Sequence, residues 1–531
     1  MAEGLRPKLS YVLMLCVVRC RNAYDCIHYS NLLGQGKRPK YMERIKEAAV
    51  EIVRTLRERG HQAYLVGGCV RDLLLGREPA DYDVATDATP DEVMSIFPRT
   101  YAVGAQFGVV LVPVKNGFPR KGDAALEQSE DEKPFSVEQL PKPHARVIEV
   151  ATFRNDGAYT DGRHPDAVRY SKDPREDVQR RDFTINGLLL DPDGGPDLGS
   201  VADGQVLDFV GGRADLQSGL VRTIGDPERR FTEDKLRLLR AVRFAARFDY
   251  RIEAQTFEAI RRLAPQIRQV SRERVRDELA KMLIEGHARK AFELLDETGL
   301  LHEVLPEVEK MKGVEQPPQF HPEGDVWVHT LLLLDMLPEG CSKTLAWGTL
   351  LHDVGKPPTF SIGPDRIRFD GHVEVGVAIA GEICHRLRLS NDETEQIKAL
   401  VANHMRFADA RKMKESTLKR FMRLPNFEEH LELHRLDCLG SHGSLDLYDF
   451  VREQYENTPP EEIRPAPLIT GNDLIAAGLK PGPAFKDILS VVEDAQLEGQ
   501  LRSRDDAMRF VQQLVLTHPE LDPHQTYGVR P

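Results

Sequence analysis

Hydrophobic positions divide the chain into two parts with different periodicities. Up to about residue 225, short apolar runs alternate with amphipathic segments of helical spacing. The runs predict strands, and the amphipathic segments predict helices. The expected strands cover 63–68, 81–86, 107–114 and 146–154, and the expected helices cover 42–60, 69–76 and 89–97. From 226 onward helical spacing continues almost throughout, with one weak strand pattern at 366–370. The chain is therefore predicted to be α+β, with a mixed sheet and helices first and helices afterwards.

Polar and proline-bearing segments predict where the chain divides into domains. The charged segment 116–144 is interpreted as a mobile insertion between two strands. Proline-rich joints cover 317–325 and 457–467, and regular patterning begins near Met42. The expected parts are a disordered or spurious extension, a head, a helical neck, a second helical domain and a helical tail. Their boundaries are 1–41, 42–225, 226–316, 317–456 and 457–531.

Composition limits the protein class without deciding the activity. The formal net charge of −12 argues against a protein that coats nucleic acid without specificity, although a local basic face is compatible with it. The apolar run 11–18 is too short to cross a bilayer. The chain has 7 cysteines, and no CxxC pair occurs among them. We therefore expect a cytoplasmic protein that does not bind a membrane.

A pair of carboxylates stands out in the predicted head. Asp81 and Asp83 are two positions apart on a predicted strand, so both side chains face the same way. The Gly-Gly turn ending at Gly68 lets backbone amides approach a phosphate, and Arg71 lies one turn into the next helix. Glu149 is either a third acid of this site or an ordinary strand glutamate. Together these residues predict a nucleoside triphosphate site for two-metal nucleotidyl transfer.

The motifs around these residues resemble a known family. LVGGCVRDLLLG followed by DYD resembles the catalytic signature of class II tRNA nucleotidyltransferases and bacterial poly(A) polymerases. EDVQRRDFTINGLLLD (176–191) resembles their second motif, in which Arg181 and Asp182 are implied to contact triphosphate and ribose. Residues 225–248 and 271–283 resemble the family's neck. The resemblance implies a polymerase-beta-like head, Mg²⁺ held by the two aspartates, and an all-α neck.

The neck segment EDKLRLLR predicts how a nucleotide is chosen. Asp234 and Arg237 are three apart, so on a helix they lie side by side. A carboxylate accepts from an exocyclic amino group while a guanidinium donates to a ring acceptor, so the pair admits C and A and rejects U and G. The resemblance implies this role, with Arg240 as a further phosphate or base contact. Residues 226–290 hold 17 Lys and Arg against 11 Asp and Glu, a basic excess of six that suits an RNA backbone.

The family acts on more than one substrate, and three functions remain open. Residues 153–170 resemble the flexible loop of enzymes that switch from adding C to adding A. We favour addition of CCA to the tRNA 3′ end from CTP and ATP. Poly(A) polymerase or A-only addition is the first alternative. An HD-type hydrolase whose head has become a non-catalytic RNA-binding module is the second.

Histidines and aspartates in the second half predict another metal site. His329, His352, Asp353 and Asp437 occur in the order H…HD…D, and imidazole and carboxylate ligands on several helices suit a divalent transition metal. The arrangement resembles HD-type phosphohydrolases. In a two-metal version of that site, the additional ligands would be at His372 and His404. The resemblance implies phosphatase and 2′,3′-cyclic phosphodiesterase activity, and RNA docking without turnover is the alternative.

Overall fold

The structure is a computed structural model. It describes eight stretches of the chain, namely 38–97, 100–102, 108–114, 147–157, 167–194, 204–319, 321–364 and 366–518. The insertion at 116–144, residues 158–166 of the expected flexible loop, and all of the expected extension before residue 38 lie outside the described residues. The chain forms two compact units, the first comprising 1–237 with 251–259 and the second comprising 238–250 with 260–531.

A mixed six-stranded sheet forms the centre of the first unit. The strand order is β3-β4-β2-β1-β7-β8, and β2 and β4 run parallel while the other neighbours are antiparallel. The strands are β1 (Ala63–Val66), β2 (Asp83–Thr86), β3 (Val109–Pro113), β4 (Val147–Thr152), β7 (Leu188–Asp191) and β8 (Gln205–Asp208). The short strands β5 (Arg154–Asp156) and β6 (Val168–Tyr170) pair beside it. This confirms the predicted mixed sheet.

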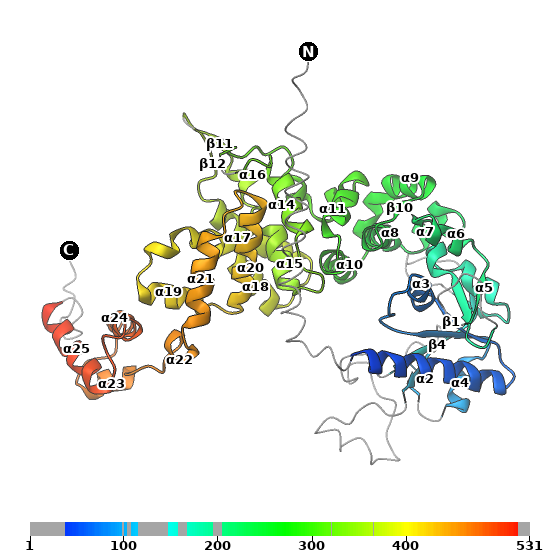
Figure 1. Cartoon of the computed structure of the whole chain (residues 1–531), viewed down its shortest axis with the longest axis horizontal. Helices are drawn as coiled ribbons and strands as arrows, with labels where there is room; N and C mark the ends of the chain where they lie inside the picture. The colour runs from blue at the N-terminus through cyan, green and yellow to red at the C-terminus, as the bar shows by residue number, and fades with distance from the viewer. Residues whose placement is uncertain are drawn as a thin grey trace. The chain divides into compact units, whose positions relative to one another are not determined.

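Helices cover both faces of this sheet. Figure 1 shows α2 (Arg38–Glu58) and α4 (Pro90–Ile96) along one face and α3 (Gly68–Leu74) on the other. The remaining helical elements of this region are α5 (Pro174–Gln179), η4 (Thr184–Asn186) and α6 (Gly212–Gln217). Local sequence explains the start of α4, where Thr89 and Glu92 form a reciprocal capping box and Pro90 occupies the first turn. The helix expected over 89–97 is confirmed, with Thr89 as its cap.

The helix expected across Asp234 and Arg237 is interrupted. Helix α7 (Pro227–Glu233) ends before Asp234, and α8 (Arg237–Arg247) begins at Arg237. Asp234 has extended backbone angles (φ −140°, ψ 106°), and its carboxylate accepts a hydrogen bond from the Leu236 amide at 3.1 Å. A short polar side chain that bonds its own backbone competes with helix continuation. The prediction that both residues lie on one helix is therefore wrong, although the Arg237 amide still donates to the Asp234 carbonyl at 3.0 Å.

Two-residue strands link the end of the head sheet region to the neck. Strand β9 (Leu220–Val221) pairs in parallel with β10 (Arg251–Ile252). Strand β10 falls in a region where the sequence predicted helices. Its residues lie between two helices and make only two pairings, too few to produce a visible period in the sequence.

The described chain beyond residue 253 is helical apart from the hairpin of β11 (Ser361–Ile362) and β12 (Ile367–Arg368). The helices are α9 (Ala254–Leu263), η5 (Ala264–Gln269), α10 (Arg272–Ile284), α11 (Ala288–Glu297), α12 (Leu300–Val304), α13 (Pro306–Glu309), α14 (Val326–Asp335), α15 (Lys343–Leu351), α16 (Lys356–Thr359), α17 (His372–Arg386), α18 (Asn391–Asn403), η6 (His404–Lys412), α19 (Glu415–Met422), α20 (Phe427–Gly440), α21 (Asp446–Asn457), α22 (Pro460–Ile463), α23 (Gly471–Ala476), α24 (Ala484–Leu497) and α25 (Arg504–Thr517). Helices α14, α15, α17, α18 and α20 pack against one another as a bundle. None of the described helices is both long and apolar enough to span a membrane.

Candidate functional site

Three carboxylates gather where β2 begins in the middle of the sheet. Asp83 starts β2 and pairs in register with Glu149 on β4 and with Val66 on β1. Asp81 is exposed just before the strand, while Tyr82 between the two aspartates is buried. Burial, Asp81 and Glu149, in that order, raise the pKa of Asp83 from 3.8 to about 7, against an opposing effect of Arg181. A bound cation would offset the repulsion among these carboxylates and the cost of burying their charge, so the set fits a divalent metal.

The glycine turn after β1 lies against two guanidinium groups. Gly67 adopts φ 80° and ψ −129°, a conformation that other residues rarely tolerate. A side-chain carbon added at Gly67 would lie 3.2 Å from Arg181 Nη1, and one added at Gly68 would lie 3.5 Å from Arg71 Nη2. The absence of side chains at both positions therefore leaves backbone and arginine donors facing the same space.

Interior hydrogen bonds hold Arg71 and Asp182 in place. Arg71 is only 4% exposed; its Nη1 donates to Asn186 Oδ1 at 2.6 Å and its Nε to Asp72 Oδ1 at 2.8 Å. Asp182 Oδ1 accepts from the Phe183 amide at 2.8 Å and from Asn186 Nδ2 at 3.0 Å. Asn186 thus joins two of the expected nucleotide-binding residues, although the sequence analysis assigned it no role. Its position in the second motif, four residues after Asp182, is the sequence feature from which this role could have been predicted.

Arg181 is oriented by a buried carboxylate. Its Nε and Nη2 donate to Asp177 Oδ2 at 3.2 and 3.0 Å, while the neighbouring Arg180 bonds Asp177 Oδ1. Burial alone would raise the pKa of Asp177, but Arg180 and Arg181 outweigh it and lower that pKa below its ordinary value. Asp177 is therefore an ionised anchor, and it leaves Arg181 Nη1 directed toward the glycine turn.

The three residues expected to contact the base or phosphate of the nucleotide have different surroundings in the structure. Arg237 Nη1 donates to Glu233 Oε2 at 3.1 Å, and Nη2 donates to the Arg180 carbonyl at 3.1 Å, so its guanidinium is anchored beside the second motif. Asp234 lies in the break between α7 and α8. Arg240 belongs to the second unit, where its Nη1 lies 4.0 Å from Glu278 Oε1.

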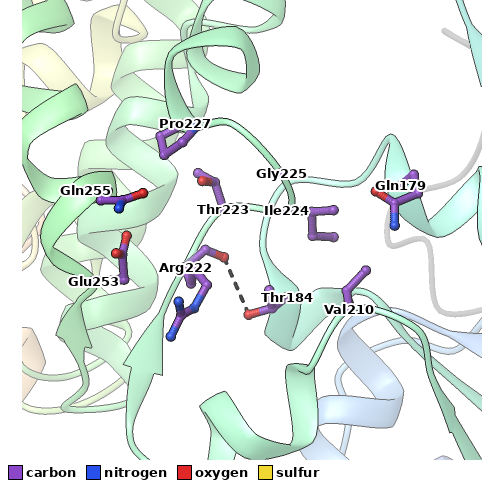
Figure 2. Close-up of a pocket in the computed structure, with 10 residues that line it drawn as sticks. All are labelled: Gln179, Thr184, Val210, Arg222, Thr223, Ile224, Gly225, Pro227, Glu253 and Gln255. Atoms are coloured by element: carbon purple, nitrogen blue, oxygen red, sulfur yellow. Dashed lines mark hydrogen bonds between the residues drawn. The ribbon is translucent and has the colours of Figure 1, made fainter.

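A pocket of about 380 Å³ opens elsewhere in the first unit (Figure 2). Figure 2 shows side chains from the second motif, from the segment that follows β9 and from the start of α9 around it, with Arg222 and Glu253 on one side. Its lining residues are Gln179, Thr184, Val210, Arg222, Thr223, Ile224, Gly225, Pro227, Glu253 and Gln255. None of them is an expected site residue, so the pocket does not coincide with the carboxylate site.

The four expected metal ligands of the helical bundle converge. His329 on α14 lies with its Nε2 3.1 Å from Asp437 Oδ1 on α20 and 3.3 Å from His352 Nε2. His352 Nε2 is 3.2 Å from Asp353 Oδ2. The His352 Nδ1 faces the Thr349 carbonyl at 2.8 Å, which fixes the ring so that Nε2 points into the cluster. His329, His352 and Asp353 thus form a group able to hold a metal ion.

A second group shares Asp353 with the first. His372 and His404 complete it, and their Nδ1 atoms face the Phe369 and Val401 carbonyls at 2.9 and 2.7 Å. Among the described residues, the buried atoms Asp353 Oδ1, His372 Nε2 and His404 Nε2 have no hydrogen-bond partner. Buried polar atoms seldom stay unpaired without an unseen ion or water. This donor set therefore fits a cation, and Asp353 belongs to both candidate groups.

Charged neighbours that the sequence analysis did not assign surround this cluster. Glu323 Oε1 lies 2.8 Å from His329 Nδ1 and 2.9 Å from His321 Nδ1. Burial would lower the pKa of His329, but hydrogen bonds to Asp437 and Glu323 outweigh it and raise that pKa to about 9. Glu323 lies in the segment that was predicted to be a proline-rich joint, so its contact with the histidines was not predicted.

Lys356 is the cation nearest to the shared aspartate. Its Nζ lies 2.6 Å from Asp353 Oδ2 and donates to Gln316 Oε1 at 2.6 Å. Burial would raise the pKa of Asp353, but Lys356 and His352 outweigh it and hold that pKa well below its ordinary value. Asp353 is thus ionised and ready to bind metal. The signal for Lys356 was its place three residues after Asp353 in HDVGKP.

Three family models match the chain in order. The poly(A) polymerase head domain matches residues 63–120 and 113–222, and the probable RNA- and SrmB-binding site of polymerase A matches 249–312. The HD domain matches 325–435. These matches confirm the predicted resemblance to the tRNA nucleotidyltransferase and bacterial poly(A) polymerase family. The two matches to the head domain overlap at 113–120, where the polar insertion begins.

Proteins similar to this chain include CCA-adding enzymes. The CCA-adding enzyme of Geobacillus sp. (strain WCH70) is 38% identical over 254 residues, which cover 48% of this chain and 53% of that enzyme. The chain thus spans about half of that relative. The CCA-adding enzyme of Leuconostoc mesenteroides is 29% identical over 88% of this chain and 96% of its own length.

A solved structure shows the same fold. The CCA-adding enzyme of Bacillus stearothermophilus, in complex with CTP, superposes with a TM-score of 0.64 at 24% identity. The superposition covers 89% of this chain and 98% of that enzyme. The fold of a mixed-sheet head followed by helices is therefore that of CCA-adding enzymes.

The raised pKa of Asp83 predicts how stability depends on pH. In EDTA, Asp83→Asn is expected to be more stable than wild type, by an amount that grows from about pH 4 to pH 7 and is then constant. The reason is that the folded-state pKa near 7 exceeds the ordinary value of 3.8, so protonation stabilises the folded state and ionisation destabilises it by a few kcal/mol. Thermal unfolding at several pH values measures this. A variant whose gain in stability falls as pH rises would contradict the assignment.

Proposed function

We propose that this protein adds C, C and A to tRNA 3′ ends from CTP and ATP, without a nucleic acid template. The observation that carries the proposal is the placement of Asp83 and Glu149 in register on the sheet, with Asp81 beside them and Arg181 near the glycine turn. The name shared by its relatives, CCA-adding enzyme, supports the choice of reaction. We therefore favour CCA addition over poly(A) synthesis as the reaction of this site.

The residues around the site suggest a division of labour. Asp81 and Asp83 would hold Mg²⁺, which when bound supplies charge neutralisation at the triphosphate and activates the attacking hydroxyl. The backbone at Gly67 and Gly68 gives phosphate oxygens close access, and Arg181 donates to them. Arg71 and Asp182 are tied to each other through Asn186, so we propose that they fix the shape of the cradle.

Nucleotide choice is assigned to the break between α7 and α8. Arg237 is held by Glu233 and by the Arg180 carbonyl, so its donors are preorganised. Asp234 next to it would accept from the exocyclic amino group of C or A. Arg240 remains a proposed phosphate or base contact. A carbonyl in place of that amino group, as in U or G, would leave the Asp234 carboxylate without a donor, which disfavours binding.

An extension assay tests the proposal. A tRNA ending before CCA is incubated with magnesium and CTP and ATP, and in parallel with UTP and GTP; an unrelated RNA serves as the comparison. We expect growth by three nucleotides, confined to CTP and ATP and to tRNA. Long A-tails on either RNA would establish the poly(A) alternative, and no growth at all would reject transfer by the head.

The helical bundle supports a second activity. We propose a metal-dependent phosphohydrolase, acting as phosphatase and 2′,3′-cyclic phosphodiesterase on RNA ends. Its support is the unpaired set of Asp353 Oδ1, His372 Nε2 and His404 Nε2 beside the group of His329 and His352. A divalent transition metal bound to these imidazoles would supply Lewis acidity. Lys356, 2.6 Å from Asp353, would place a positive charge next to the substrate phosphate.

We further propose that the chain is a cytoplasmic enzyme divided into a disordered or spurious extension (1–41), a head (42–225), a neck (226–316), an HD domain (317–456) and a helical tail (457–531). The matched family regions at 63–222, 249–312 and 325–435 support the three central parts. The described cysteines Cys69, Cys341, Cys384 and Cys438 are free thiols, as suits a reducing compartment.

A further inference from the structure

A cationic pocket in the second unit has no role in either proposed reaction. It has a volume of about 250 Å³ and lies between α10, α15 and the start of α18. Three cations line it, Arg276, Lys343 and Arg388, together with Asp277 and Glu393. The buried Trp347 forms part of its wall.

Arg388 occupies a backbone position that arginine rarely takes. Its φ is 59°, in the left-handed region just past the end of α17. The Leu389 amide donates to the Cys384 carbonyl at 3.0 Å and the Arg388 amide to His385 at 3.1 Å, a helix ending in which glycine is the usual residue.

Arg388 differs in residue type from the other non-glycine residues that have a positive φ. The non-glycine residues with positive φ in the described part of the chain are Asp249, His287, Asn426 and Arg388. Asp, His and Asn are enriched in the left-handed region, whereas arginine is not. A residue that strains its backbone suggests that its side chain has a function there.

The cationic side chains of this pocket are only partly paired with acidic groups. Arg276 Nη1 donates to the Arg388 carbonyl at 2.5 Å, and its Nε bonds Asp277 at 2.9 Å. Within the described residues, the side chains of Arg388 and Lys343 form no hydrogen bond or ion pair, and both are exposed. Both are thus exposed cations of the pocket lining, and the charge of Lys343 also acts on Glu393, whose pKa it helps to lower.

The carboxylate of Glu393 already has a structural task. Its Oε2 accepts from the Ser390 amide at 3.0 Å and from the Ser390 hydroxyl at 2.9 Å, closing a capping box at the start of α18. The helix end is therefore occupied, and the cations supply the attraction for a ligand. Three positive and two negative side chains leave the pocket with a formal excess of one positive charge.

We infer that this pocket binds a backbone phosphate of the RNA substrate. Helix α10 lies within the region matched as an RNA-binding site, residues 249–312, whereas Lys343 and Arg388 lie beyond it. The pocket thus extends an RNA-binding surface onto the HD domain. Arginine and lysine side chains suit the charge of a phosphodiester. The inference rests on the proposed function only in taking RNA as the ligand.

Arg388→Gly, Lys343→Ala and Glu393→Gln test the inference in opposite directions. We expect the first two to weaken binding of tRNA by about 3- to 10-fold and to reduce the slope of log K against log salt by about 0.7–0.9 each. Glu393→Gln should tighten binding, because glutamine preserves the capping box while removing a negative charge. Arg388→Gly should also raise the unfolding temperature, so weaker binding could not be attributed to misfolding.

The measurement is fluorescence anisotropy of labelled tRNA across a potassium chloride series, with the full chain. Lys412→Ala, whose side chain is 82% exposed elsewhere on the second unit, is the matched control and should bind as wild type does. In the three pocket variants the KM for tRNA in nucleotide addition should change in the same direction as the binding constant, whereas Lys412→Ala should keep the wild-type KM. If wild type extends tRNA while Arg388→Gly and Lys343→Ala keep its affinity and salt slope, the inference is overturned. If wild type neither binds nor extends tRNA, the proposed function fails instead.

Discussion

Asp83→Asn is expected to lower CMP and AMP incorporation into tRNA by at least about a thousandfold. Asn is nearly isosteric but carries no charge, and it stands where β2 meets the central strands β1 and β4. The loss of one carboxylate from the group of Asp81, Asp83 and Glu149 would remove metal binding worth several kcal/mol of transition-state stabilisation, and each 1.36 kcal/mol is a factor of about ten. Single-turnover extension at saturating magnesium measures the effect.

Tyr82→Phe is the matched control for this experiment. The tyrosine lies between the two aspartates in sequence, but it is buried on the opposite side of the strand. Incorporation should stay within about threefold of wild type, because only a hydroxyl is removed from packing. Asp83→Asn with nearly normal incorporation, and with an unfolding temperature at least as high as that of wild type, would refute metal binding by Asp83.

Asp353→Asn is expected to abolish metal retention by the helical bundle and to lower phosphohydrolase activity at least a thousandfold. Asp353 is the shared member of both ligand groups and lies 3.2 Å from His352 and 3.7 Å from His404. An amide supplies one weak, neutral ligand atom in place of the charged carboxylate oxygens that both groups share. Metal content after dialysis and hydrolysis of a 2′,3′-cyclic phosphate measure the two effects.

The two activities should separate cleanly in these variants. Asp353→Asn should retain nucleotide addition, and Asp83→Asn should retain hydrolysis, because each removes a ligand from a different unit. His385→Ala is the matched control, since His385 is on α17 with His372 but is exposed and outside the cluster. Full hydrolysis by Asp353→Asn would reject Asp353 as a metal ligand for that reaction, and no hydrolysis by wild type would leave RNA docking as the role of the bundle.

Local sequence determined most of the secondary structure. The alternation around Asp81 and Asp83 and the cap at Thr89 act over only a few residues, so they could be recognised without knowing what packs on them. The order of His329, His352, Asp353 and Asp437 was readable for a different reason, because ligand residue types cluster along helices in a familiar order. Their convergence within hydrogen-bonding distance was an expectation that needed the bundle to be tested.

Local competition explains the error at Asp234. The periodicity of EDKLRLLR is helical, yet the Asp234 carboxylate bonds the Leu236 amide and ends α7. Periodicity reports which face is apolar and is insensitive to a single capping interaction. The strain at Arg388 is equally invisible in the sequence, because the residue type alone predicts an ordinary surface position.

By itself, the sequence determined the types of element, the family, and the residues whose chemistry is visible in short motifs. Only the tertiary structure decided that Glu149 stands beside Asp83, that Asn186 ties Arg71 to Asp182, and that Glu323 and Lys356 surround the histidine cluster. These contacts join residues through sheet register and helix packing. Such pairings depend on the whole chain and leave no periodic trace within any one segment.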